Sequence, residues 1–318
     1  MKCVILDDYQ NVALQLVDWS LISNEVKITS INKHIYNEDE LVESIIDYEI
    51  IIIMRERTPF PASLLKRLPN LKLLITSGMR NASINMNVAT TLGITVCGTA
   101  SSSQPPTELA WSLILGLSRN IVQESQTLRS NGPWQSTIGT DLYGKKLGLI
   151  GLGKIGSRMA QIGKAFGMEI IAWSQNLTKE RTDEIGVDKA DLLEELLEKS
   201  DIVSIHLVLS DRTRNLIREK ELQLMKRDAF LINTSRAAIV NQEDLVVALK
   251  NNWIAGAGLD VYEQEPLPEN HSFRELPNVL ALPHLGYVTR ANYETYFREA
   301  VEDIQAFLRG EPIRVLKS

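Results

Sequence analysis

Three polar residues in the second half of the chain, Arg236, Glu265 and His284, each follow a short apolar run. If the three runs form parallel strands, these residues come to one edge of a sheet, where ligands of open α/β sheets bind. A guanidinium presents a rigid fork to a carboxylate and a carbonyl oxygen, and an imidazole beside a carboxylate can exchange a proton near neutral pH. The combination fits hydride chemistry on a 2-keto acid.

Each of these residues also has a plainer interpretation. Arg236 could form a surface salt bridge, Glu265 could be a solvated loop charge, and His284 could be a structural histidine with satisfied hydrogen bonds. His206 lies within another apolar run, where a structural or cofactor-lining role is more common than a catalytic one. The residue types alone leave these alternatives open.

A glycine-rich run, residues 151–156, matches the pattern GxGxxG through Gly151, Gly153 and Gly156. It directly follows the apolar residues 147–150 and opens a helix-like segment, which is the context that makes the pattern informative. Gly151 permits a tight turn, Gly153 lets the backbone approach a pyrophosphate, and Gly156 lets helix and strand pack closely. The run predicts a dinucleotide-binding turn, with a glycine turn that holds no ligand as the alternative.

Short runs rich in Val, Ile and Leu alternate with helix-like segments along most of the chain. This alternation predicts an α/β protein with two doubly wound parallel sheets. Strands are expected at 2–6, 26–31, 49–54, 71–76 and 94–96 in a first series and at 146–150, 169–173, 202–209, 229–233, 254–260 and 279–282 in a second. Helices are expected at 38–46, 61–68, 107–129, 157–166 and 291–309. The Ser/Pro-rich segment 101–106 interrupts the pattern and predicts a domain junction.

The composition is that of an ordinary globular protein. Of 318 residues, 44% are hydrophobic, and 34 Lys and Arg against 40 Asp and Glu give a net charge of −6. At roughly 150 residues per domain, this length suggests two domains. The chain has no basic block of the kind that binds nucleic acid and no apolar run long enough to span a bilayer. We therefore expect a cytoplasmic protein with neither nucleic-acid nor membrane partners.

The cysteines and histidines of the chain do not indicate a disulfide or a metal site. Cys3 and Cys97 are expected to be buried, reduced thiols, because both lie in apolar segments far apart in the chain. The four histidines show no zinc-ligand spacing, so we expect no metal.

Four motifs, in this order and spacing, resemble those of the D-isomer-specific 2-hydroxyacid dehydrogenase family, which includes glyoxylate/hydroxypyruvate reductases, phosphoglycerate dehydrogenases and formate dehydrogenases. The motifs are residues 148–156, 232–236, 258–266 and 283–286. The resemblance covers essentially the whole chain. It implies an NAD(P)-binding Rossmann domain, residues 101–287, inserted into a flavodoxin-like substrate domain built from residues 1–100 and the C-terminal helix region 288–318. It also implies a homodimer formed through the cofactor domain.

The resemblance further implies residue roles. Arg236 would bind the substrate, His284 would act as acid/base, and Glu265 would orient and tune His284. Asp260 would hold the nicotinamide carboxamide. The resemblance also implies that backbone amides around Gly78 and Met79 bind the substrate carboxylate, with Arg55 nearby. Arg80, in the same loop, is a further candidate substrate-binding residue. The expected cofactor-binding residues are Gly151, Gly153, Lys154, Ile155, Gly156, Ser174, Gln175, His206, Thr234 and Asp260.

Three positions depart from the family pattern. Arg80 places a bulky cation in the substrate loop where a small residue is common, so the identity of the substrate stays open. Residues 206–208 read His-Leu-Val instead of His-x-Pro, and residues 235–237 read Ser-Arg-Ala instead of Ser-Arg-Gly. The loop geometry beside the nicotinamide is therefore expected to differ slightly from the family pattern.

These features predict reduction of a small 2-keto acid to its D-2-hydroxy acid by NAD(P)H, or the reverse. One alternative is a formate dehydrogenase, but by resemblance such an enzyme carries Gln beside the histidine, and Glu265 argues against it. The other is a dinucleotide-sensing protein like the C-terminal-binding corepressors, which carry additional tails, whereas this chain is close to the bare enzyme length.

The cofactor preference depends on the residue that follows the strand expected at 169–173. An NAD site usually has an acidic residue there to bind the ribose 2′-hydroxyl. This chain has Ser174 followed by Gln175, and Lys179 and Arg181 come a few residues later. No carboxylate repels a 2′-phosphate, and two cations could reach it, so NADPH is the expected cofactor. The alternative is that both cations belong to a solvated helix start.

Overall fold

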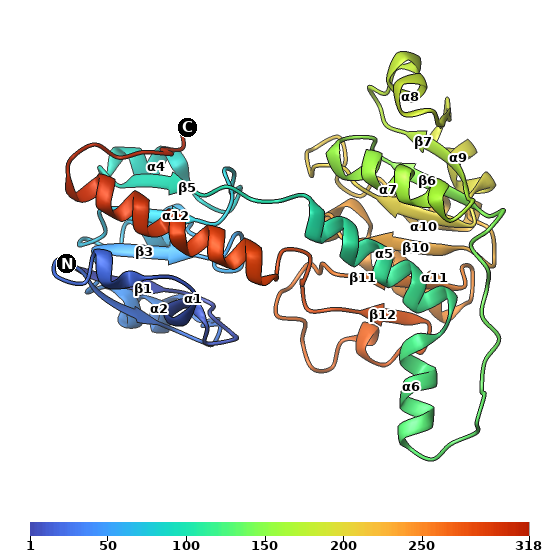
Figure 1. The fold of residues 1–318 in the computed structure, drawn as a ribbon, viewed down its shortest axis with the longest axis horizontal. Coiled ribbons are helices and arrows are strands. Elements are labelled where there is room, and N and C mark those ends of the chain that lie inside the picture. Colours follow the sequence, from blue (N-terminus) through green and yellow to red (C-terminus); the bar gives the residue numbers. More distant parts are fainter. Residues whose placement is uncertain (318) are drawn as a thin grey trace. The chain divides into compact units, whose positions relative to one another are not determined.

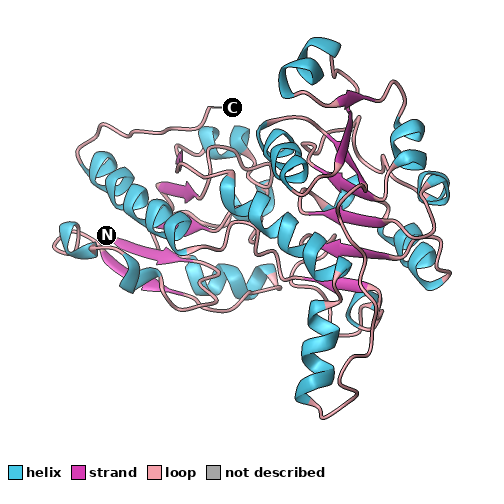
Figure 2. Cartoon of the chain, turned by 45° about the vertical axis from the view of Figure 1, so that its right-hand side comes forward, coloured by secondary structure: helices cyan, strands magenta, loops and turns pink. Residues whose placement is uncertain are grey.

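The computed structural model describes residues 1–317. The chain divides into two compact units: Met1–Ser102 with Val288–Ser318 is unit 1, and Ser103–Tyr287 is unit 2. Each unit contains one parallel sheet with helices packed against it (Figure 1). Figure 2 shows the strands of each unit between layers of helices. The prediction of two parallel-sheet α/β regions is confirmed.

The sheet of unit 1 has the strand order β2-β1-β3-β4-β5, which is the flavodoxin-like order. Its strands are β1 (Lys2–Ile5), β2 (Lys27–Ser30), β3 (Ile50–Ile53), β4 (Leu73–Thr76) and β5 (Thr95–Gly98). Strands β3 and β4 are buried at every position, as expected for parallel strands covered on both faces.

Helices cover both faces of this sheet. One face packs against α2 (Glu38–Ile45), α3 (Ala62–Leu65) and α4 (Met86–Thr91), whose apolar side chains cluster with alternate strand residues such as Ile51 and Leu74. Successive strand residues point to opposite faces, so their neighbours face away from this cluster. Helix α1 (Ala13–Leu16) contacts α12 (Arg290–Leu308), which also contacts β4. The C-terminal helix α12 thus packs on unit 1, as the red ribbon in Figure 1 shows.

The sheet of unit 2 has the order β12-β11-β10-β9-β6-β7-β8. Counted from β6, this is the Rossmann order with one additional edge strand. Its strands are β6 (Lys146–Ile150), β7 (Glu169–Trp173), β8 (Asp188–Lys189), β9 (Ile202–Ile205), β10 (Phe230–Asn233), β11 (Gly256–Leu259) and β12 (Val279–Ala281).

Two hydrophobic clusters lie on the opposite faces of this second sheet. One cluster contains apolar residues of α5 (Gln104–Ser118) and α7 (Lys154–Ala165). The other contains residues of α9 (Leu193–Lys199), α10 (Glu219–Leu224) and α11 (Gln242–Lys250). The remaining helices of this unit are α6 (Ile121–Arg129) and α8 (Lys179–Ile185), and short 3-10 turns occur at Trp19–Leu21, Ala237–Ile239 and Ser272–Arg274.

The structure differs from the expected elements at several points. The strand expected at 202–209 ends at Ile205. The prediction of a single helix at 107–129 is wrong. The helix is interrupted between α5 and α6 at Asn120, whose φ of 50° is left-handed. The two-residue strand β8 was not expected, so the second sheet has one more strand than predicted.

Two further expectations concern thiols and membranes. Cys3 and Cys97 are free and buried, as predicted. Within residues 1–317, no helix combines the length and the apolar character that a membrane crossing requires.

Candidate active site

Strands β10, β11 and β12 are hydrogen-bonded neighbours that run parallel, so their carboxyl ends lie at one edge of the sheet. Arg236 follows β10, Glu265 follows β11, and His284 follows β12. The order of the strands is therefore what brings these three predicted residues to the same edge of unit 2. This is the edge at which doubly wound sheets bind ligands.

His284 and Glu265 form a direct pair. His284 Nδ1 lies 2.6 Å from Glu265 Oε2, and Glu265 Oε1 accepts a hydrogen bond of 2.9 Å from the amide of Tyr262. The two side chains are 18% and 23% exposed, so they are accessible without being fully solvated. Because Nδ1 faces the carboxylate, Nε2 is the ring nitrogen that can exchange a proton with a substrate.

Asp260 holds the backbone that follows His284. Its Oδ1 accepts a hydrogen bond from the amide of Leu285 at 2.6 Å, and its Oδ2 accepts one from the amide of Gly286 at 2.8 Å. Asp260 is fully buried, and this burial raises its pKa to about 6, while the nearby His284 charge and the two amides act to lower the pKa. The sequence suggested Asp260 as a cofactor residue and did not reveal this contact.

Arg236 lies at the start of a 3-10 turn, Ala237–Ile239, in extended backbone conformation. Its Nη1 donates a hydrogen bond of 2.8 Å to the carbonyl of Ser235, and its own carbonyl accepts one of 3.1 Å from Asn233 Nδ2. Ser235 Oγ in turn donates to the carbonyl of Leu207 at 2.8 Å. These contacts fix the loop that carries Arg236, and the predicted cofactor residue Thr234 lies in the same loop.

The glycine turn has the geometry that a pyrophosphate requires. Gly151 has φ of 106°, and a Cβ there would lie 2.6 Å from the carbonyl oxygen of His206. A Cβ on Gly156 would lie 2.1 Å from the carbonyl oxygen of Gly151, whereas a Cβ on Gly153 would meet no protein atom within 4 Å. Gly151 and Gly156 are therefore needed for packing, and the space above Gly153 is open to a ligand.

The same turn begins α7, a helix of 12 residues whose N-cap, Gly153, provides no side-chain hydrogen bond. The predicted contacts Lys154 and Ile155 are the first two residues of this helix. Amides at such a helix start attract an anion. The residues present thus fit a dinucleotide pyrophosphate.

His206 is neutral at physiological pH. Burial lowers its pKa to about 4, and its Nε2 lies 2.9 Å from Ser204 Oγ. Its backbone, rather than its ring, is the part that contacts Gly151. The predicted role of His206 in cofactor binding stays a prediction.

The predicted substrate residues of unit 1 lie in the loops after β3 and β4. Arg55 has φ of 54°, and its Nη1 lies 2.7 Å from the place where a Cβ of Gly78 would stand. The guanidinium therefore lies directly over Gly78, which requires the absence of a side chain there. Met79 and Arg80, which follow, are exposed. The amide of Gly78 donates to Thr99 Oγ1 at 3.2 Å, so the protein already uses one of the amides expected to bind a carboxylate.

Three supporting residues of unit 1 were missed by the sequence analysis. Ser77 Oγ accepts a hydrogen bond of 3.0 Å from the amide of Arg55, and Asn81 Nδ2 donates one of 2.7 Å to the carbonyl of Arg55. The third, Thr99, holds Gly78. The sequence shows only that these polar residues lie beside or near the predicted substrate loop. It does not show which groups they hydrogen-bond.

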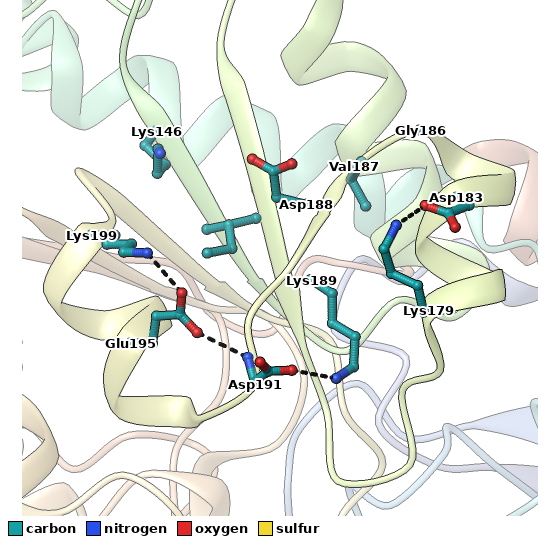
Figure 3. Close-up of a pocket in the computed structure, with 11 residues that line it drawn as sticks. Lys146, Lys179, Asp183, Gly186, Val187, Asp188, Lys189, Asp191, Glu195 and Lys199 are labelled. Atoms are coloured by element: carbon teal, nitrogen blue, oxygen red, sulfur yellow. Dashed lines mark hydrogen bonds and ion pairs between the residues drawn. The ribbon is translucent and has the colours of Figure 1, made fainter.

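A separate charged groove of about 690 Å³ lies near β8 and contains none of the predicted catalytic or substrate-binding residues (Figure 3). Lys179, suggested by the sequence for a 2′-phosphate, is part of its lining. Each lysine of its lining is paired with a carboxylate: Lys199 Nζ lies 2.7 Å from Glu195, Lys189 Nζ lies 2.8 Å from Asp191, and Lys179 pairs with Asp183. Lys146 pairs at 2.9 Å with Glu169, which lies outside the lining. We therefore do not assign the active site to this groove.

The family model for "D-isomer specific 2-hydroxyacid dehydrogenase, NAD binding domain" matches residues 111–286. The chain belongs to the D-isomer-specific 2-hydroxyacid dehydrogenase family. The matched segment lies within unit 2 and contains the glycine turn, Arg236, Glu265 and His284. The family resemblance noted in the sequence is thereby confirmed.

Named relatives agree with this membership. A glyoxylate reductase of Aeropyrum pernix is 41% identical over 257 residues, which cover 78% of this chain and 76% of that protein. A D-3-phosphoglycerate dehydrogenase of Methanocaldococcus jannaschii is 34% identical over 86% of this chain and 52% of its own length. The crystal structure of a phosphoglycerate oxidoreductase from Vibrio cholerae superposes with a TM-score of 0.93 at 38% identity, covering 98% of this chain and 99% of that one.

This 2-hydroxyacid dehydrogenase is therefore an oxidoreductase that acts on CH–OH donors with a nicotinamide cofactor. The family membership and these relatives do not favour a sensor without turnover.

Proposed function

We propose that this 2-hydroxyacid dehydrogenase reduces a small 2-keto acid to the D-2-hydroxy acid, or catalyses the reverse, with NADPH as the preferred cofactor. The pair of His284 and Glu265, with 2.6 Å between Nδ1 and Oε2, is the observation that carries this proposal. When bound, the nicotinamide cofactor supplies the hydride that reduces the carbonyl carbon.

His284 exchanges the proton that accompanies this hydride. In the reductive direction, Nε2 gives a proton to the carbonyl oxygen, which becomes the hydroxyl of the product. Glu265 stabilises the charged imidazole and holds its orientation through Nδ1. In the oxidative direction, Nε2 takes the hydroxyl proton.

Arg236 binds the substrate's oxygen atoms through its guanidinium, and this positive charge polarises the carbonyl. In unit 1, Arg55 and the amide of Met79 bind the substrate carboxylate. The guanidinium of Arg55 over Gly78 supports this assignment, because a carboxylate needs donors on an open backbone surface. Arg80 contributes a further cation next to Met79.

The proposed preference for NADPH rests on the residues after β7. Ser174 and Gln175 line a cavity that contains no carboxylate among the described residues that form it. A 2′-phosphate therefore meets no repulsion there, whereas the usual acidic residue of an NAD site would repel it.

We also propose a homodimer formed through unit 2. Helix α6 buries none of its residues, and the loop after it leaves Trp134, Ile138 and Tyr143 exposed by 81%, 96% and 82%. Exposed apolar groups in one segment are typical of an interface. Light scattering tests this, and Trp134→Glu with Ile138→Glu should give a monomer. The expected cytoplasmic location stays a prediction.

The proposed reaction is tested by following the absorbance of NAD(P)H as it is oxidised with glyoxylate, hydroxypyruvate, pyruvate and phenylpyruvate in turn. Turnover with at least one keto acid and formation of the D-product are expected. If the protein binds NADPH but reduces none of the four acids, the proposal of a small 2-keto acid substrate fails.

A further inference from the structure

A cavity of about 380 Å³ lies next to the glycine turn of unit 2. Residues 173–176, at the end of β7 and after it, form one part of its lining, and the loop after β9 forms the other. Gly151 connects the cavity to the turn, because its amide donates to the carbonyl of Trp173 at 2.8 Å and a Cβ on it would lie 3.0 Å from Leu207 Cδ2. The cavity thus continues from the expected pyrophosphate position, which suits the adenosine half of a dinucleotide.

The two cations that the sequence suggested for a 2′-phosphate do not line this cavity. Lys179 is paired with Asp183 one helical turn away, as Figure 3 shows. Arg181 is engaged at each part of its guanidinium: Nη1 bonds Glu184 at 2.6 Å, Nη2 bonds Ser157 Oγ at 2.9 Å, and Nε faces a carbonyl at 3.4 Å. Binding a phosphate would require Arg181 to give up these contacts.

Arg212 differs from Lys179 and Arg181 in its position and in its contacts. It lies in the loop after β9 and lines the same cavity as Ser174 and Gln175. Its exposed side chain forms no hydrogen bond or ion pair with any of residues 1–317. A cation without a partner, facing a cavity that lacks carboxylates, leaves a positive charge that an anionic ligand can neutralise.

We propose that Arg212 determines cofactor specificity by binding the 2′-phosphate of NADPH, with Ser174 and Gln175 as neutral hydrogen-bonding neighbours. The guanidinium fork forms two parallel hydrogen bonds to phosphate oxygens. This inference rests on the proposed preference for NADPH. It assigns the positive charge that distinguishes NADPH from NADH to the loop after β9 rather than to the residues after β7.

The test compares two probes that differ only in the 2′-phosphate: adenosine 2′,5′-bisphosphate and adenosine 5′-monophosphate. Their Kd values are measured by calorimetry for the wild-type protein, Arg212→Ala, Arg181→Ala and Arg214→Ala. Arg214 is the matched control, because it is an exposed arginine of the same loop that does not line the cavity. All four proteins are first checked for an unchanged melting temperature.

We expect the wild-type protein to bind the bisphosphate more tightly, and Arg212→Ala to weaken that binding by roughly tenfold to a hundredfold. Monophosphate binding should be unchanged in this variant, and Arg214→Ala should behave as wild type. Equal weakening of both probes by Arg212→Ala would overturn the inference, as would an undiminished preference for the bisphosphate in Arg212→Ala. Loss of that preference in Arg181→Ala would then assign the phosphate to Arg181. A wild-type protein that does not discriminate between the probes would instead contradict the proposed NADPH preference itself.

Discussion

The buried carboxylate of Asp260 accepts a hydrogen bond of 2.8 Å from the backbone amide of Gly286. A second amide, that of Leu285, donates to the same carboxylate at 2.6 Å. These amides directly follow His284, which itself has φ of 53°. A Cβ at position 286 would lie 3.1 Å from Asp260 Oδ2, so the backbone there lies close against the carboxylate. Asp260 therefore fixes the backbone that follows His284, and we expect it to act as a positioning residue for the imidazole.

Asp260→Asn should lower kcat by about tenfold and destabilise the fold by about 1–3 kcal/mol. The side-chain NH2 of asparagine would face one of the two backbone donors, and that buried donor would then lose its acceptor. Steady-state kinetics and urea unfolding measure the two effects. Glu269→Gln, an exposed carboxylate of the same unit, is the control and should match the wild type in both. An unchanged kcat in Asp260→Asn would show that Asp260 does not position His284.

His284→Ala should lower kcat by about 10²- to 10⁴-fold, because it removes the general acid/base. NADPH binding, measured by fluorescence titration, should persist. Glu265→Gln should do less damage, since the amide can still hydrogen-bond the ring but cannot stabilise its positive charge. Near-normal turnover of His284→Ala would exclude the proposed proton transfer.

The ends of the strands were predictable because the strands are nearly continuous apolar runs. His284 follows such a run almost directly and Arg236 follows one within a few residues, and parallel pairing then brings both to one edge. The glycine turn was equally recognisable, because the need for a missing Cβ at Gly151 and Gly156 leaves a signature at fixed spacing.

Other features depend on contacts that no local pattern records. Strand β8 has only two residues and exists because they pair with Ile171 and Ala172. The break between α5 and α6 falls at Asn120, without Gly or Pro, so only the tolerance of asparagine for left-handed φ hints at it. Arg181 looked available to a phosphate, but it contacts Ser157, 24 residues away in the chain.

His206 should make the protein less stable in acid. Burial lowers its pKa to about 4 in the folded state, whereas an unfolded histidine titrates near 6.5. Between these values the unfolded state binds more protons, so the stabilising contribution is complete above about pH 6.5 and is lost as the pH falls toward 4. His206→Gln should reduce this loss by at most about 3 kcal/mol.

The measurement for His206 is the free energy of unfolding between about pH 4 and 8, for the wild-type protein and the variant. The raised pKa of Asp260, about 6, acts in the opposite direction, since its contribution is lost as the pH rises toward that value. The difference between the two proteins removes the contribution of Asp260, which both contain. Parallel pH curves for wild type and His206→Gln would contradict the lowered pKa of this partly buried histidine.

Ser174→Asp should abolish the preference for NADPH. In the unmodified protein, kcat/KM for NADPH should exceed that for NADH by roughly tenfold to a hundredfold, the contribution expected of a charge-assisted contact with the phosphate. A carboxylate in the cavity after β7 would repel the 2′-phosphate and accept from a ribose hydroxyl instead. Both values are measured with one common keto acid. Equal values, or a preference for NADH, in the unmodified protein would reject the cofactor assignment without affecting the role of His284.

The glycine turn offers a matched pair of substitutions. In Gly156→Ala the new Cβ would lie 2.1 Å from the carbonyl oxygen of Gly151, so the helix and the turn must separate. This variant should lose about 1–3 kcal/mol of stability or more, as overpacked cores do, and should bind NADPH poorly. In Gly153→Ala the Cβ meets no protein atom within 4 Å, so thermal stability should be preserved. If a pyrophosphate lies over Gly153, its Cβ collides with the ligand alone, and calorimetry should show weakened NADPH binding in a fully stable protein. Undiminished NADPH affinity in Gly153→Ala would mean that the cofactor does not approach this backbone.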